Sequence, residues 1–232
     1  MSEVCFKDSG IEWIGEIPEH WGIKKLKFLG KFFGGLTGKV AEDFSKEEQK
    51  GYSPFIPFVN ICNNIVVDNN KMEYVKTDDN DQQNFVLNQD ILFMMTSENR
   101  EDLGKSAIYL GEQTPFLNSF CKGFRATDLA IKPKFLVWLL QGSRYREYFG
   151  LMGNGFTRIN LRLYPLQNLY VAIPPLQEQE AIARYLDEKT QAINELISTH
   201  QKSIEKLKNY RISLISEAVV GKKNLQGMNN GN

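Results

Sequence analysis

Two lysine–acid pairs are the residues that come closest to a hydrolytic metal site. Glu73 lies three residues before Lys76, and Glu101 lies four residues before Lys105. A metal-dependent nuclease needs several carboxylates and a lysine gathered around the ion. Neither pair has the usual spacing after a strand that carries an aspartate. We therefore do not expect this chain to cleave nucleic acid, and a self-sufficient nuclease is the least favoured interpretation.

Other catalytic signatures are missing from the sequence. The two histidines, His20 and His200, offer little for a histidine triad or a metal site. The three cysteines, at 5, 62 and 121, have neither a zinc-ligand spacing nor an even count for disulfides. No GxxxxGK[ST] phosphate loop occurs, nor do the glycine-rich loop and the Asn/Asp-Pro-Pro-aromatic loop of an adenine methyltransferase. We expect a non-catalytic chain with no metal or cofactor of its own.

The charged residues are distributed unevenly along the chain. Lys and Arg together number 28, as do Asp and Glu, and this zero net charge counts against binding DNA by bulk electrostatics alone. Residues 122–162 nevertheless carry eight basic and two acidic side chains, whereas residues 68–90 carry six acidic and two basic ones. This asymmetry permits a basic face on a neutral molecule, although ordinary solvated charges would give the same counts.

Three segments combine polar side chains of the types that can bind DNA. Arg and Lys bind phosphates, and Arg, Lys, Asn and Gln can contact base edges in the major groove. The best candidate is 96–105, followed by 154–162 and then by 118–125. Each could equally be a solvated turn. The predicted DNA-binding residues are Ser97, Asn99, Arg100, Lys105, Asn118, Lys122, Arg125, Thr157, Arg158, Asn160 and Arg162.

A mixed, strand-rich domain over 1–173 must position these segments. Pro133 begins its best-predicted helix, which should continue to Phe149. Trp13 and Trp21 are expected to anchor the core rather than stack on bases, and His20 is expected in a turn. Alternation of Lys with Leu and Phe predicts a strand at 25–32. Apolar runs between Asn, Asp and Gly clusters predict further strands at 55–61, 65–67, 72–75, 85–87, 91–95, 107–110 and 169–173.

One long helix follows Pro174 and Pro175. No proline or glycine occurs from Leu176 to Val220, which predicts a helix of about 65 Å at about 1.5 Å per residue. Gly221 should end it. Apolar residues recur at spacings of three and four, as in a coiled-coil seam. The predicted interface residues are Leu186, Ile193, Leu196, Ile197, Ile204, Leu207 and Leu214.

Such a helix cannot bury its whole stripe against a compact domain, so it needs a second helix. We expect self-association or a partner subunit; the alternative is a helix that breaks near Thr190 and folds back. The fold is thus predicted as α+β, with a domain at 1–173, a dimerisation helix at 174–222 and a disordered tail at 223–232. Without a basic-then-apolar leader or an apolar run of about 18 residues, we expect a cytoplasmic protein with no membrane segment.

Two segments resemble a known family. Residues 9–29, SGIEWIGEIPEHWGIKKLKFL, are similar to the opening of a target-recognition domain in type I restriction-modification specificity subunits. Residues 173–197, with the core P-P-L-x-E-Q, resemble the conserved region that follows such a domain. Weaker similarity at 90–93, 104–108 and 155–161 extends the match from residue 9 to about 222. The resemblance implies recognition of double-stranded DNA without catalysis by this chain.

The resemblance also implies partners. Methyltransferase and restriction subunits would carry S-adenosylmethionine, ATP and Mg, and the methyltransferase subunit would dock at Gln177, Glu178 and Gln179. Acidic residues at this position also suit the start of a helix.

This sequence departs from the family by holding one unit, where the family's subunits carry two in tandem, paired through antiparallel helices. The resemblance therefore implies a homodimer with an antiparallel coiled coil that recognises a two-part palindromic site and directs DNA methylation. The alternative is a coiled-coil interaction module that modulates a restriction or methylation complex without contacting bases.

Overall fold

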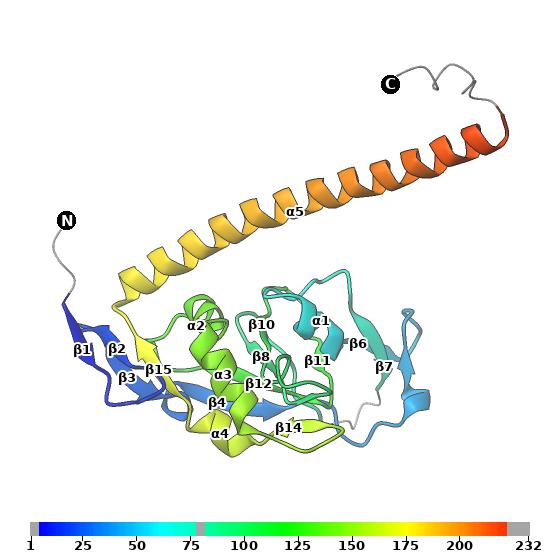
Figure 1. Cartoon of the computed structure of the whole chain (residues 1–232). Helices are drawn as coiled ribbons and strands as arrows, with labels where there is room; N and C mark the ends of the chain where they lie inside the picture. Colours follow the sequence, from blue (N-terminus) through cyan, green and yellow to red (C-terminus); the bar gives the residue numbers. More distant parts are fainter. Residues whose placement is uncertain (1–4, 78–81, 222–232) are drawn as a thin grey trace. The chain divides into compact units, whose positions relative to one another are not determined.

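The computed structural model describes residues 5–77 and 82–221 and divides the chain into two units (Figure 1). The first unit ends at Ala183, and the second begins at Arg184, inside the long C-terminal helix. The first is rich in short strands and the second is helical, which confirms the predicted α+β class. The tail predicted at 223–232 lies outside the described residues.

An antiparallel four-stranded sheet, in the order β10-β8-β12-β4, forms the centre of the first unit. Its strand β8 is buried at every residue because successive side chains enter different apolar clusters. Ile91 and Phe93 pack in the cluster that includes residues of α2 and α3, whereas Leu92 packs in the cluster that includes Ile61 of α1. The elements are β4 (Gly30–Gly34), β8 (Ile91–Met94), β10 (Ser106–Ile108), β12 (Cys121–Ala126), α1 (Phe58–Asn63), α2 (Pro133–Leu139) and α3 (Ser143–Met152).

A second sheet has the order β11-β6-β7-β5, with β11 parallel to β6. Its strands are β5 (Phe44–Ser45), β6 (Tyr52–Ile56), β7 (Glu73–Lys76) and β11 (Phe116–Leu117). Smaller sheets pair β1 (Phe6–Asp8) with β2 (Glu16–Pro18), β3 (Gly22–Lys25) with β15 (Tyr170–Ile173), and β14 (Ile159–Leu161) with both β13 (Gly153–Asn154) and β9 (Thr96–Ser97). The short helices are η1 (Leu26–Phe28), η2 (Ala41–Asp43) and α4 (Leu163–Gln167).

Three predicted elements are interrupted. The strand predicted at 25–32 is broken by η1, which leaves Phe28 65% exposed while Leu26 is buried. The strand predicted at 55–61 ends before Pro57, since proline has no N–H to continue the ladder, and α1 follows. The helix predicted at 133–149 divides into α2 and α3 at Gly142, because glycine is a poor helix former.

Other predicted strands have mixed outcomes. The run at 85–87 forms no strand, and the run at 65–67 contributes a single bridge from Val66 to Ile108. The strands predicted at 72–75, 91–95, 107–110 and 169–173 are confirmed with small shifts at their ends.

The tryptophans of the N-terminal segment are half-buried and pack against apolar clusters of the first unit. Trp13 contacts Tyr145 edge-on, with ring centroids 5.1 Å apart, and Tyr148 at 4.8 Å. Trp21 packs in a small cluster that contains Ile14 and Ile17. His20 lies in the turn that precedes β3.

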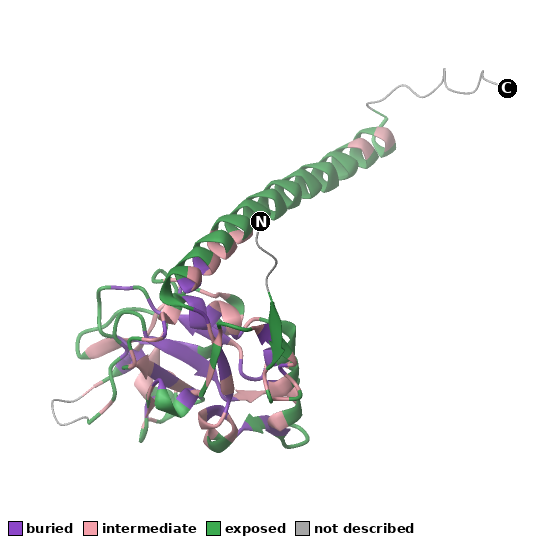
Figure 2. Cartoon of the chain, turned by 90° about the vertical axis from the view of Figure 1, so that its left-hand side faces the viewer, coloured by how far each residue is buried: buried purple, intermediate pink, exposed green. Residues whose placement is uncertain are grey.

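The long helix α5 spans Leu176–Val219 without a break at Thr190, and Gly221 follows with a φ of 71°. From Arg184 onward most of its residues are exposed (Figure 2). Of the predicted interface residues, Leu186 and Leu214 are half-buried, and the others are 48% to 66% exposed. None of the described helices is long and apolar enough to cross a membrane.

Candidate nucleic-acid interface

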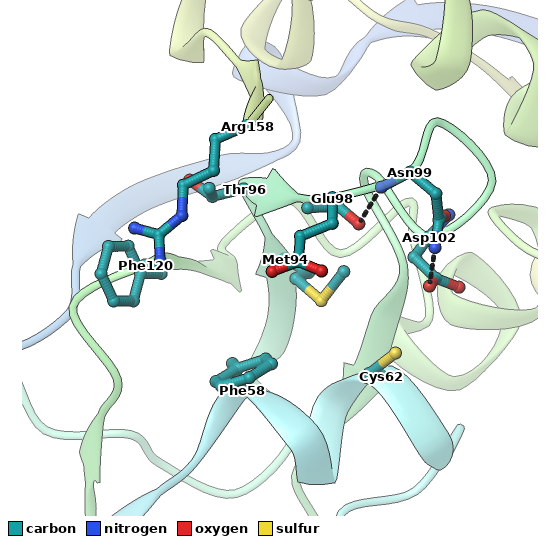
Figure 3. A pocket seen from close by; sticks show the side chains of 10 residues that line it. Phe58, Cys62, Met94, Thr96, Glu98, Asn99, Asp102, Phe120 and Arg158 are labelled. Carbon is teal, nitrogen blue, oxygen red and sulfur yellow. Dashed lines mark hydrogen bonds between the residues drawn. The ribbon is translucent and has the colours of Figure 1, made fainter. Parts of the chain in front are cut away.

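An open cleft of about 320 Å³ lies where α1, the end of β8 and β9 meet the loops at 98–102, 118–120 and 155–158 (Figure 3). Its floor and walls combine apolar rings with polar side chains. The lining residues are Phe58, Cys62, Met94, Thr96, Ser97, Glu98, Asn99, Asp102, Phe120 and Arg158.

Arg158 enters this cleft from the segment before β14 (Figure 3). Its guanidinium carbon lies 5.7 Å from the centroid of the Phe120 ring, which is within cation–π range. Among the described residues, the Arg158 guanidinium has no hydrogen bond or ion pair. It therefore presents its N–H donors to the cleft while the ring of Phe120, which is 49% exposed, limits its movement.

The β13–β14 hairpin forms one rim of the cleft. Asn160 pairs with Thr96 of β9, and the Thr96 hydroxyl donates to Asn160 Oδ1 at 2.8 Å. Gly155 turns the hairpin with a φ of 129°, and a Cβ there would lie 2.0 Å from the carbonyl oxygen of Arg158, so only glycine fits. Phe156 at the tip is fully exposed, at 101%.

Two arginines fasten the loop at 97–105 to the end of α3. Arg100 donates to the carbonyl oxygens of Gly150 at 2.7 Å and Gly153 at 3.2 Å. In the opposite direction, Arg146 donates to the carbonyl oxygens of Glu101 at 2.6 Å and Leu103 at 2.7 Å. Arg100 was predicted to bind DNA, and in this structure its guanidinium holds the loop in place.

Asp102 organises the polar end of the cleft. Lys105 binds it with 2.5 Å between Nζ and Oδ1, and Asn99 donates to its other oxygen at 2.8 Å. These hydrogen bonds, that from Lys105 foremost and then that from Asn99, hold the pKa of Asp102 below its usual value. Lys105 also lies 3.7 Å from the Cys62 sulfur. The Asp102 carboxylate therefore stays ionised beside the cleft, and the Lys105 ammonium group offsets part of its negative charge.

In the third predicted segment, 118–125, the predicted residues Asn118 and Arg125 make hydrogen bonds within the chain, while Phe120 lines the cleft. Arg125 donates through Nε to Asp90 Oδ1 at 2.9 Å and through a terminal nitrogen to Asp90 Oδ2 at 2.6 Å. This hydrogen-bonded pair raises the pKa of Arg125. Asn118 accepts a hydrogen bond from the N–H of Phe120 and so shapes the turn that presents this ring.

Three of the predicted DNA-binding residues, Ser97, Asn99 and Arg158, thus line one cleft, and Asn160 borders it through Thr96. The remaining predicted residues do not line it: Arg100, Lys105, Asn118, Lys122, Arg125, Thr157 and Arg162. Contact of these eleven residues with DNA stays a prediction.

The aromatic rings at the cleft were missed by the sequence prediction. Phe58 and Phe120 are 45% and 49% exposed. A signal was available for two of the exposed rings, because Phe120 follows Asn118-Ser119 and Phe156 follows Asn154-Gly155. An aromatic residue directly after turn-forming residues has no strand or helix periodicity that would bury it.

The first residues of α5 belong to the first unit, and two of their polar side chains, Gln179 and Glu178, bond to other parts of that unit. Gln179 is fully buried, donates to the carbonyl oxygens of Ala130 and Pro174, and accepts from the N–H of Lys132, each at 2.8 Å. Its side chain is therefore not accessible to a methyltransferase subunit, contrary to the predicted docking role. Docking through Gln177 and Glu178 stays a prediction.

Glu178 connects α5 with the N-terminal segment. It accepts hydrogen bonds from Trp21 Nε1 at 3.0 Å and from His20 Nε2 at 2.7 Å. The bond from Trp21, with a smaller contribution from His20, holds the pKa of Glu178 below its usual value of 4.5.

Neither Glu73 nor Glu101 belongs to a cluster of possible metal ligands in the described residues. Within the parts of the chain that the structure describes, no three His, Cys, Asp or Glu side chains gather in a way that could hold an ion.

The chain is similar to specificity subunits in sequence. It is 30% identical over 200 residues to a putative type I restriction enzyme MjaX specificity subunit of Methanocaldococcus jannaschii, covering 84% of this chain and 44% of that protein. It is 26% identical over 213 residues to the type I restriction enzyme EcoKI specificity subunit of Escherichia coli, covering 90% and 44%. The chain therefore spans less than half the length of these relatives.

Solved structures show the same fold. The crystal structure of the HsdS subunit from Thermoanaerobacter tengcongensis matches with a TM-score of 0.60 at 15% identity, over 92% of this chain and 47% of that one. A chain from a study of complex assembly and conformational transition of the type I R-M system matches with a TM-score of 0.64 at 17% identity, over 92% and 48%. The family model described as "Type I restriction modification DNA specificity domain" matches residues 18–214. The chain therefore belongs to the type I restriction-modification DNA specificity domain family.

Proposed function

We propose that this chain is a non-catalytic, sequence-specific DNA-recognition subunit of a type I restriction-modification system, and that the cleft beside β9 contacts the base edges. The observation that carries the proposal is that Arg158 and Glu98 line one open cleft. Their side chains match the major-groove edges of guanine and cytosine respectively. The Asn99 amide is bonded to Asp102 through both its nitrogen and its oxygen, so it shapes the loop. A guanidinium without an intramolecular hydrogen-bond partner in the described chain is free to make such a contact.

The charges support base-edge contacts inside the cleft and phosphate contacts by residues outside it. Glu98 and Asp102 line it, and their carboxylates would repel phosphates, so the cleft suits base edges better than the DNA backbone. Exposed Arg162 and half-buried Lys122 lie outside it. In the proposed complex these two residues bind phosphates and set the register of the protein on the duplex.

Self-association completes the proposed function. The interface residues between Arg184 and Val219 are largely exposed on a continuous helix, and an apolar stripe of this kind requires a second helix. We infer that two copies pair through antiparallel α5 helices. The resulting twofold symmetry requires a two-part palindromic site, and the helix pair sets the distance between its halves.

The dimer is tested by light scattering on the full chain. Ile197→Glu combined with Ile204→Glu places charges in the stripe and should give a monomer. Lys202→Glu, on the opposite helix face, is the matched control and should remain dimeric. A wild-type monomer at micromolar concentration would contradict the proposed pairing.

Catalysis is assigned to partners in this proposal. A methyltransferase subunit would dock near Gln177 and Glu178 and bring S-adenosylmethionine, and a restriction subunit would bring the ATP- and Mg-dependent activity. Co-expression with the methyltransferase subunit, followed by mapping of methylated positions across a genome, tests the assignment. A two-part palindromic motif should appear only when this chain is present. Co-purification of the two proteins without any change in methylation would favour the interaction module instead.

A further inference from the structure

We propose that Phe156 is a specificity-determining residue that contacts the C5-methyl group of a thymine in the major groove. The inference rests on the proposed DNA-recognition function and adds an apolar contact to its polar ones. Phe156 is 101% exposed at the tip of the β13–β14 hairpin, and Thr157 and Arg158 beside it are exposed too. A single exposed apolar side chain is ordinary on a protein surface. Phe156 differs because an anchored hairpin carries it and because Arg158, two residues later, lines the cleft.

The hairpin that carries Phe156 adjoins the cleft. Strand β14 pairs with β9, whose residues Thr96 and Ser97 line the cleft, and Arg158 lies two residues after Phe156. Buried Ile159 and Gly153 fix the base of the hairpin, while Gly155 provides a turn that no other residue would fit. Phe156 is thus presented by an anchored turn, two residues before Arg158, which lines the cleft.

The widths of the two DNA grooves favour the major groove for this hairpin. A two-stranded ribbon fits the major groove, which is about 12 Å wide, and does not fit the minor groove, which is about 6 Å wide. A polar base edge held against a phenyl ring would lose its hydrogen bonds to water without replacement. The thymine methyl is the apolar group that the major groove offers, so the ring of Phe156 is suited to a thymine.

The test uses the full chain and DNA alone. Selection from a random duplex pool first defines the site that the wild type binds. Duplexes in which each thymine is replaced in turn by deoxyuridine then remove one methyl group at a time. At one position in each half-site, this replacement should weaken wild-type binding about fourfold, the value expected for burying one methyl group. Phe156→Ala should bind the unmodified site more weakly and be insensitive to uridine at that position.

Controls distinguish the loss of this thymine contact from misfolding and from a failure of the proposed DNA recognition. Leu129→Ala truncates another exposed side chain, 88% exposed and outside the cleft, and should keep the wild-type uridine profile. Both variants should melt at the wild-type temperature. The inference is overturned if the wild type selects a site that has no methyl-sensitive thymine, or if Phe156→Ala keeps the sensitivity. A wild type that selects no sequence at all overturns the proposed function as well.

Discussion

The guanidinium carbon of Arg158 lies 5.7 Å from the centroid of the Phe120 ring, and both side chains line the same cleft. The ring restricts the arginine without occupying its hydrogen-bond donors. We expect Arg158→Ala to weaken binding of the cognate site by about 1–3 kcal/mol and to relax specificity at one base pair. Competition binding with single-base variants of the selected site measures both effects. Uniform weakening on all sequences would indicate a phosphate contact instead.

Arg100→Ala should behave differently because Arg100 donates to the carbonyl oxygens of Gly150 and Gly153. We expect a loss of about 1–2 kcal/mol in the free energy of unfolding, as charged donors are removed from backbone acceptors. Thermal or urea denaturation provides the measurement. The base preference at each position should match that of the wild type, whereas a preference altered at one position would restore Arg100 to the base-contacting set.

Asp90 and Arg125 form an ion pair in which Asp90 is buried, at 1% exposure, while Arg125 is 40% exposed. Asp90→Asn should lower the free energy of unfolding by about 3 kcal/mol, the lower end of the range for breaking a buried pair. Asp128→Asn is the matched control, because the Asp128–Lys24 pair is more exposed and is screened by solvent, so its loss should destabilise the fold less. Equal losses for the two variants in urea denaturation would show that burial is not decisive here.

Acid should loosen the contact of Glu178 with Trp21. The pKa of Glu178 is lower in the folded chain than its usual 4.5, so its contribution to stability is complete above pH 4.5. The contribution is lost as pH falls through the lowered pKa. The difference in melting temperature between wild type and Glu178→Gln should therefore shrink as pH falls below 4.5. A difference that grows in that range would reverse the sign of this linkage.

Helix length should set the spacing between half-sites. Seven residues inserted after His200 keep the apolar stripe in phase and lengthen the helix by about 10 Å, equivalent to about 3 base pairs. The preferred spacer, read from the selected DNA or from the methylated motif, should become longer. An unchanged spacer in a variant that is still dimeric would exclude the helix pair as the element that sets this distance.

The elements predicted best are those with a strong local signal. Helix α5 lies in a stretch of 45 residues, 176–220, that contains no proline or glycine, and β8 is a short apolar run between turns, so both could be located from sequence alone. The prediction of a strand at 25–32 was wrong in part. The alternation of apolar and charged residues continues through η1, where tertiary packing and not periodicity decides the backbone conformation. Leu29 is buried by residues that are distant in sequence.

The candidate site was only partly predictable for a similar reason. Residue type indicates that an arginine can donate hydrogen bonds, but it does not indicate where the acceptor is. Gly150 is 50 residues from Arg100, and Asp90 is 35 residues from Arg125. Arg158 has no such partner among the described residues, and the fold alone distinguishes it from the other two.

The buried amide of Gln179 affects how recognition modules can be exchanged between proteins. Because it joins Pro174, Ala130 and Lys132, the first two turns of α5 belong to the same packed body as the strands, and Ala183 lies in its main apolar cluster. A chimera joined at Pro174–Pro175 would separate this amide from its acceptors. A crossover point after Ala183 would transplant the module intact and leave the remainder of the helix to be contributed by the host.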